Sequence, residues 1–175
     1  FDGTAVLGES WLAQNDELST TLSVGYINAK YDEFLGPTGV DVANQRVFQN
    51  TPEWTSSWRI NYSTPFKLIN TDGNLTFVNS LSYRSDSSQF EAPMPLLDQE
   101  AYTLWDMSLV FKTDKGWTIG VHGKNLSDER YKVAGYNFVT QTGPTTFVPT
   151  LGREGTLTAF YGDPRTWWVS LTNEF

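Results

Sequence analysis

The chain has 175 residues, which is enough for one domain with a sizeable core. Its net charge of −8, with no basic stripe, argues against a nucleic-acid-binding protein. Cysteine is absent, which excludes disulfides and thiolate metal sites. Aromatic residues make up 15% of the chain and charged residues only 18%, yet no apolar run approaches the roughly 20 residues of a membrane helix.

Seven segments are predicted to be strands. Six of them alternate apolar and polar residues with a period of two, which is typical of strands with two different environments, and the first has no clear phase. In chain order the predicted strands are residues 1–14, 18–32, 53–63, 74–84, 101–112, 117–124 and the run after Pro164 to Phe175.

The connections between these strands alternate in length. In chain order they are 15–17, 33–51, 64–73, 85–100, 113–116 and 133–163, with 125–131 expected to continue the sixth strand without a break. Asp72-Gly73 predicts the hairpin turn within 64–73. Short turns on one side and long loops on the other are typical of an outer-membrane barrel. Seven strands leave two open edges, which hydrocarbon does not tolerate, so the chain is predicted to be part of a larger barrel.

The two faces of the predicted strands differ in chemistry. One face is rich in hydroxyl groups and is expected to line a wet interior. The other carries large aromatics that are expected to face lipid or to form interfacial girdles. These are Trp54, Trp58, Tyr62, Tyr83, Trp105, Trp117 and Trp167. A soluble β-sandwich would also alternate, and remains an alternative.

Three segments together resemble the C-terminal barrel portion of TonB-dependent outer-membrane receptors. The stretch Asn125-Leu126-Ser127-Asp128-Glu129-Arg130-Tyr131 is similar to the NLxDxxY signature of that family. The run from Tyr161 to Phe175 resembles its closing strand, and Asn50-Thr51-Pro52-Glu53-Trp54, with Ala29-Lys30-Tyr31-Asp32 before it, is similar to another stretch. The residues that carry the signature are Asn125, Leu126, Asp128, Tyr131, Pro164, Arg165 and Phe175.

This resemblance implies that residues 1–175 form the C-terminal part of a 22-stranded barrel in the bacterial outer membrane, with the plug domain and the earlier strands outside this chain. Such receptors bind a scarce ligand, often a ferric siderophore, and the TonB complex drives import by pulling on the plug. The implied partners are therefore outer-membrane lipid, the TonB complex, a ferric siderophore or other small ligand, and the barrel-assembly machinery at the C-terminal strand. No cofactor and no catalytic activity are expected.

Four alternatives stay open at this point. The barrel would be a passive porin or channel, or a receptor of the same family that imports cobalamin or carbohydrate. An outer-membrane hydrolase would need a Ser/His/acid arrangement with His122, the one histidine, as its base. The soluble sandwich would be a binding module.

Candidate site residues come from the long loops. His122 has no second histidine or cysteine to form a metal site, so none is predicted. The carboxylates of Asp128, Glu129 and Asp163 lack an accompanying nucleophile or base. Loop aromatics near two arginines would stack on and pair with an anionic, aromatic ligand. The predicted ligand-binding residues are Arg84, Phe90, Tyr136, Phe138, Phe147 and Arg153.

Overall fold

The computed structural model of the protein describes residues 1–141, 147–149 and 157–174. Over these residues the fold is all-β, with a single turn of 3-10 helix, η1 (Ala43–Gln45). In this part of the chain no helix is long and apolar enough to cross a membrane.

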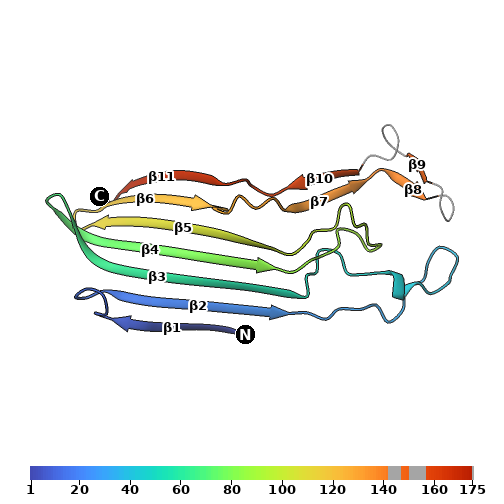
Figure 1. Ribbon diagram of the computed structural model, residues 1–175, viewed down its shortest axis with the longest axis horizontal. Coiled ribbons are helices and arrows are strands. Elements are labelled where there is room, and N and C mark those ends of the chain that lie inside the picture. Colours follow the sequence, from blue (N-terminus) through green and yellow to red (C-terminus); the bar gives the residue numbers. More distant parts are fainter. Residues whose placement is uncertain (142–146, 150–156, 175) are drawn as a thin grey trace.

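Seven strands form one antiparallel sheet in the order β1-β2-β3-β4-β5-β6-β11 (Figure 1). They are β1 (Asp2–Glu9), β2 (Glu17–Tyr26), β3 (Trp54–Leu68), β4 (Thr71–Arg84), β5 (Tyr102–Thr113), β6 (Trp117–Lys124) and β11 (Thr166–Asn173). Two small antiparallel pairs lie beyond the sheet. They join β7 (Lys132–Asn137) with β10 (Leu157–Tyr161), and β8 (Val139–Gln141) with β9 (Phe147–Pro149).

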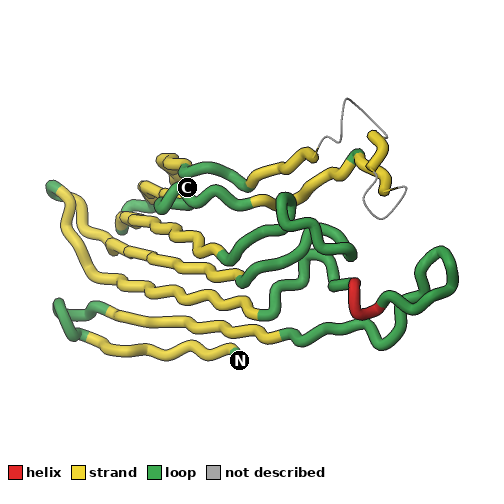
Figure 2. Tube along the Cα trace, turned by 45° about the vertical axis from the view of Figure 1, so that its right-hand side comes forward, coloured by secondary structure: helices red, strands yellow, loops and turns green. Residues whose placement is uncertain are grey.

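The prediction of seven strands is confirmed for the main antiparallel sheet, whereas the four short strands of the two small pairs were not predicted. The sorting of the connections by length is also confirmed. Residues 10–16, 69–70 and 114–116 form the short turns, which lie together at the left end of the sheet in Figure 1. The long connections leave from the other end, where Figure 2 shows loops and η1 beyond a curved, single-layered sheet. The sheet is open, because β1 and β11 each pair with one other strand.

The predicted hairpin turn at Asp72-Gly73 is wrong. Leu68 pairs with Thr71, so the two-residue loop is Ile69-Asn70, and Ile69 has a left-handed φ of 57°. Gly73 lies inside β4, where a Cβ atom would collide with the Phe111 ring and the backbone of β5. A glycine in a strand often marks such a close approach, and here it marks contact with β5 and not a turn.

Several predicted boundaries also differ. β1 ends at Glu9 and not at residue 14, and β3 continues to Leu68 and not only to residue 63. β2 ends at Tyr26 and not at Asp32. Residues 125–131 do not continue β6, because Asn125 and Asp128 take positive φ values of 49° and 56° and turn the chain away. The predicted loop 133–163 contains strands, since β7 and β10 pair with each other across about twenty intervening residues. Neither β7 nor β10 is long enough to show a clear alternation of apolar and polar residues by itself.

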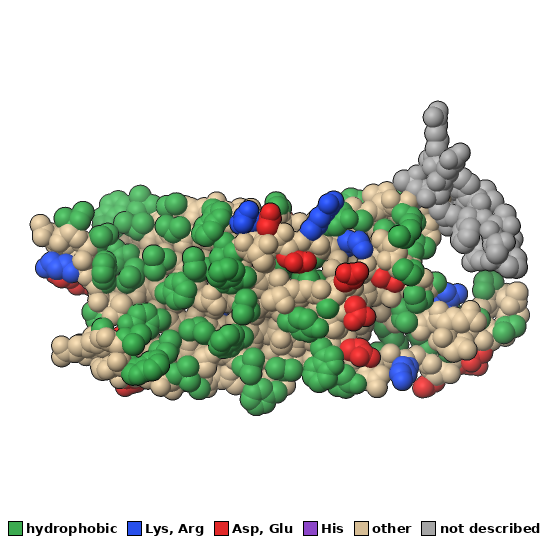
Figure 3. Space-filling model, viewed as in Figure 1, with side chains coloured by type: hydrophobic (Ala, Val, Ile, Leu, Met, Phe, Trp, Pro, Cys, Tyr) green, Lys and Arg blue, Asp and Glu red, His purple; other side chains and the backbone are tan. Residues whose placement is uncertain are grey.

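The register gives the sheet two distinct faces. On the apolar face one row of facing residues runs through Leu18, Tyr62, Phe77, Leu109, Val121 and Val169. The neighbouring row on the polar face runs through Ser19, Asn61, Val78, Ser108, His122 and Trp168. Figure 3 shows hydrophobic side chains gathered over the strands, with charged groups toward the ends.

The sheet has almost no core of its own. Among the described residues, Leu97 and Phe111 are the apolar side chains that are buried. On the apolar face Val169 is 70% exposed and Leu171 is 65% exposed. An apolar surface of this extent marks a face that something other than water covers.

Candidate functional site

A polar junction joins the exit of β6 to the entrance of β11, and it is made by residues 125–131 and 162–166. Asn125 is buried at its centre, with 4% of its surface exposed. Its Nδ2 donates hydrogen bonds to the carbonyl oxygens of Glu129 (2.8 Å) and Asp163 (3.0 Å), and its Oδ1 accepts one from the Glu129 N–H (2.8 Å). The Asn125 N–H donates to the Asp106 carboxylate of β5 (2.8 Å). Through its side chain and its backbone N–H, Asn125 therefore links β5, the segment after β6 and the segment before β11.

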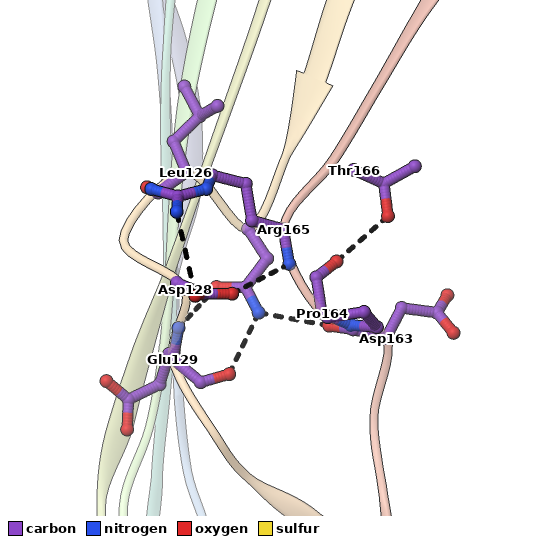
Figure 4. Close-up of polar contacts among 8 residues, drawn as sticks. Leu126, Asp128, Glu129, Asp163, Pro164, Arg165 and Thr166 are labelled. Carbon is purple, nitrogen blue, oxygen red and sulfur yellow. Dashed lines mark hydrogen bonds and ion pairs between the residues drawn. The ribbon is translucent and has the colours of Figure 1, made fainter.

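The junction is completed by an arginine and an acid (Figure 4). The Arg165 N–H donates to Asp128 Oδ1 (3.1 Å), and its guanidinium lies 3.7 Å from Asp128 Oδ2. Arg165 Nη1 also donates to the Leu126 carbonyl (3.5 Å). The Pro164 carbonyl accepts a hydrogen bond from the Thr166 hydroxyl (2.9 Å). The structure thus brings these signature residues together as a structural junction, while Phe175 lies outside the described residues.

Tyr131 ends the signature segment and packs between two parts of the junction. Its ring stacks on Tyr102 of β5, with 4.7 Å between the ring centroids, and its carbonyl accepts a hydrogen bond from the Gly162 N–H (2.9 Å). Burial raises the pKa of the Tyr131 hydroxyl, so this group stays a neutral phenol. The contacts of this junction hold the exit of β6 beside the entrance of β11.

Arg84 lies at the end of β4, on the polar face. It faces Thr55 of β3 and Tyr102 of β5 in the register. It lines a hollow of about 530 Å³ whose other lining residues include the facing hydroxyl row Ser23, Ser57 and Ser82. Arg84 Nη2 donates to the Asn50 carbonyl (2.8 Å), but its Nε is buried without a hydrogen-bond partner.

A smaller cavity of about 70 Å³ adjoins the hollow, sharing Arg84, Asn50 and Tyr102 with it. Lys132, at the start of β7, also lines it, although it is not one of the predicted ligand-binding residues. Lys132 Nζ donates to the Asp98 carbonyl (2.6 Å). No local pattern marks Lys132, because three separate long connections build the cavity.

The predicted aromatic residues lie on several different elements. Tyr136 lies in β7 and not in a loop; its ring stacks on Phe138 and meets the edge of Phe160, with centroids 5.7 and 5.6 Å apart. Tyr136 is 55% exposed and Phe160, which the sequence analysis missed, 46%. Phe90 is half-buried in the connection after β4. Phe147 lies in β9 and Arg153 lies outside the described residues.

His122 lies on the polar face between two serines. Its Nδ1 is 2.9 Å from Ser108 Oγ and its Nε2 is 2.9 Å from Ser170 Oγ, and its ring stacks on Trp168. In a Ser/His/Asp triad, a carboxylate accepts a hydrogen bond from Nδ1 of the histidine. Here Ser108, and not a carboxylate, contacts Nδ1 of His122. Over the described ranges no group of three or more histidines and carboxylates is placed to hold a metal ion.

Comparison with known proteins gives one partial likeness. The ferric-pyoverdine M114 receptor PbuA of Pseudomonas sp. (strain M114) is 29% identical over 79 residues. The match covers 45% of this chain and 8% of the receptor, so the chain spans only a small part of that relative's length. No family model matches the chain. No solved structure matches it either.

Proposed function

We propose that residues 1–175 are the C-terminal part of the barrel of a TonB-dependent outer-membrane receptor for a ferric siderophore or a similar scarce chelate. The observation that carries this proposal is the partial match to a ferric-pyoverdine receptor. The signature segment supports it, because its residues build one well-connected junction between strands.

Two features of the sheet support a location in a membrane. Its apolar face is exposed along all the central strands, and its long connections leave from one end. Lipid would cover the apolar face, and the polar face would line the lumen. The edges β1 and β11 would pair with strands outside this chain, as hydrocarbon requires. The barrel-assembly machinery would act on the C-terminal strand.

The function is binding and transport. The long connections on the outer side capture the chelate, the siderophore keeps the iron, and the TonB complex moves a plug domain that lies outside this chain. A hydrolase is less well supported, since Ser108 and not a carboxylate contacts His122 Nδ1. A passive channel, or a receptor for cobalamin or carbohydrate, has no specific observation in its favour.

Uptake of radioactive iron from ferric pyoverdine tests the proposal. We expect energy-dependent uptake in cells that carry the gene encoding this chain, and its loss when the gene, the TonB protein or the proton gradient is removed. Uptake that survives loss of the gradient would indicate a passive channel. Uptake of labelled cobalamin or carbohydrate, without uptake of ferric pyoverdine, would show that the receptor has a different ligand.

A further inference from the structure

Two cationic side chains line the cavity of about 70 Å³ beside the hollow. Arg84 ends β4, and Lys132 begins β7. The other lining residues include Asn50 of the connection 27–53 and Gln89 of the connection 85–101. The cavity therefore lies where all three long connections of the chain meet. Its volume suits a small planar group such as a carboxylate, not a whole ligand.

Neither cation has a carboxylate partner among the residues that the structure describes. The ion pairs among the described residues are Lys67–Asp72, Lys112–Glu174 and Arg165–Asp128. Arg84 and Lys132 instead donate to neutral backbone carbonyls. Asp98 contributes its backbone carbonyl to Lys132. The Asp98 carboxylate accepts hydrogen bonds from the N–H groups of Gln89 and Met94, within its own connection. Two cationic residues thus line one small cavity, and within the described residues no carboxylate forms an ion pair with either of them.

One donor in this place also lacks an acceptor. Arg84 Nε is buried and has no hydrogen-bond partner. Buried guanidinium N–H groups are almost always paired, so this one calls for an acceptor that is absent here. One neighbouring amide is already engaged, since Gln99 accepts from the Lys132 N–H (2.5 Å) and donates to the Glu100 carbonyl (2.7 Å). A bound anion would supply the missing acceptor.

The adjoining hollow offers room for the rest of a ligand. Its volume of about 530 Å³ falls within the range of small-molecule sites. Its serine row would form hydrogen bonds with a polar, hydroxyl- or amide-bearing body. Glu53 also lines the hollow, but its side chain is exposed and does not line the smaller cavity.

We propose that Arg84 and Lys132 bind a free carboxylate of the captured ligand, while the adjoining hollow, whose lining includes the serine row, holds the rest of the ligand. A carboxylate oxygen accepts the Arg84 Nε–H, and the Lys132 ammonium adds a second charge. The inference rests on the proposed function, because it assigns the cavity to the ligand and not to an acidic side chain from another part of the protein.

Calorimetric titration of the full-length protein in detergent with citrate, a metal-free tricarboxylate, tests this site. Both Arg84→Gln and Lys132→Gln are expected to weaken citrate binding about tenfold or more, the usual effect of removing one charge-assisted hydrogen bond. The control is Arg59→Gln, which removes an exposed cation that is on the same polar face but lines neither cavity. It should leave binding unchanged, and the neutral triethyl ester of citrate should not bind.

The outcomes separate this site from the proposed function. Equal citrate binding in all four proteins would overturn the site, even if ferric pyoverdine is taken up. Loss of citrate binding in Arg84→Gln and Lys132→Gln would support the site. This holds even if ferric pyoverdine is not taken up, in which case the transported ligand is another carboxylate. If the wild-type protein does not bind citrate and Arg84→Gln only lowers its unfolding temperature, an internal acid occupies the cavity and the proposal is wrong. Should Arg84→Gln not fold, Lys132→Gln decides.

Discussion

Asn125 and Asp163 are 38 residues apart in the sequence, and the side-chain amide of Asn125 donates a hydrogen bond to the Asp163 carbonyl at 3.0 Å. This contact holds the end of β6 beside the approach to β11. It gives a physical reason for an asparagine at the head of the signature segment, since an amide both donates to two carbonyls and accepts from one N–H.

Replacing Asn125 should destabilise the protein strongly. Asn125→Ala removes three hydrogen bonds made by a buried side chain and leaves backbone groups of Glu129 and Asp163 without these partners. We expect the free energy of unfolding in urea to fall by roughly 2–4 kcal/mol. The control Asn28→Ala, at an exposed loop position, should change it by less than about 0.5 kcal/mol. Equal effects of the two substitutions would show that the junction is unimportant.

The β3–β4 turn is predicted to tolerate glycine better than its own residue. Ile69 is 88% exposed and takes a φ of 57°, which a β-branched side chain disfavours. Ile69→Gly should therefore raise the free energy of unfolding by about 0.5–1 kcal/mol, after the greater freedom of glycine in the unfolded chain is allowed for. Leu68→Gly, one residue earlier within β3, should lower it. A loss of stability in Ile69→Gly would contradict the turn geometry.

The sequence predicted the seven strands, their two faces and the sorting of the loops, because these depend on period-two patterns and local turn signals. The turn at Ile69 could not be predicted. It depends on how closely β5 approaches Gly73, which is a contact between strands far apart in sequence. The pairing of β7 with β10 was missed for the same reason.

The candidate site was only partly predictable. Arg84 stands out as a cation at a strand end, and the register then places it on the polar face. Lys132 has no local signal, since its role depends on three connections meeting at one cavity. Phe160 was hidden because the strand that carries it was read as a loop.

The β1–β2 turn should weaken in acid. Asp16 is 3% exposed; burial would raise the pKa of its carboxyl, but hydrogen bonds from the N–H groups of Leu12, Ala13 and Trp11 and from the Tyr62 hydroxyl bring the pKa below its ordinary value of 3.8. The folded state thus binds this proton less readily than the unfolded state does. The stabilisation is present above the ordinary pKa and is lost as the pH falls through the lower, folded value.

Urea unfolding between about pH 5 and pH 3 checks this dependence. Wild-type protein should lose stability as the pH falls, and Asp16→Asn should show a flatter profile because residue 16 no longer titrates. Tyr62→Phe removes one of the four donors and should give a slope between the two. An unchanged slope in Asp16→Asn would assign the acid sensitivity to other carboxylates.

The two faces of β5 should respond differently to a charge. Leu109 is 42% exposed on the apolar face, whereas the next residue, Val110, shares the polar face with Thr76 and Gly120. Arginine facing the bilayer midplane costs roughly 2–4 kcal/mol in barrels. Leu109→Arg should therefore reduce the heat-modifiable, folded fraction in outer-membrane preparations, while Val110→Arg should not. The reverse order would place the lumen on the opposite face.

Quenching by lipid along β5 tests the membrane orientation most directly. Because the chain has no cysteine, single cysteines at residues 107–111 can be labelled with a fluorophore and the protein placed in vesicles of brominated lipid. We expect strong quenching for Met107→Cys, Leu109→Cys and Phe111→Cys, and weak quenching for Ser108→Cys and Val110→Cys. Uniformly weak quenching at all five positions would contradict a lipid-facing sheet, and with it the receptor barrel.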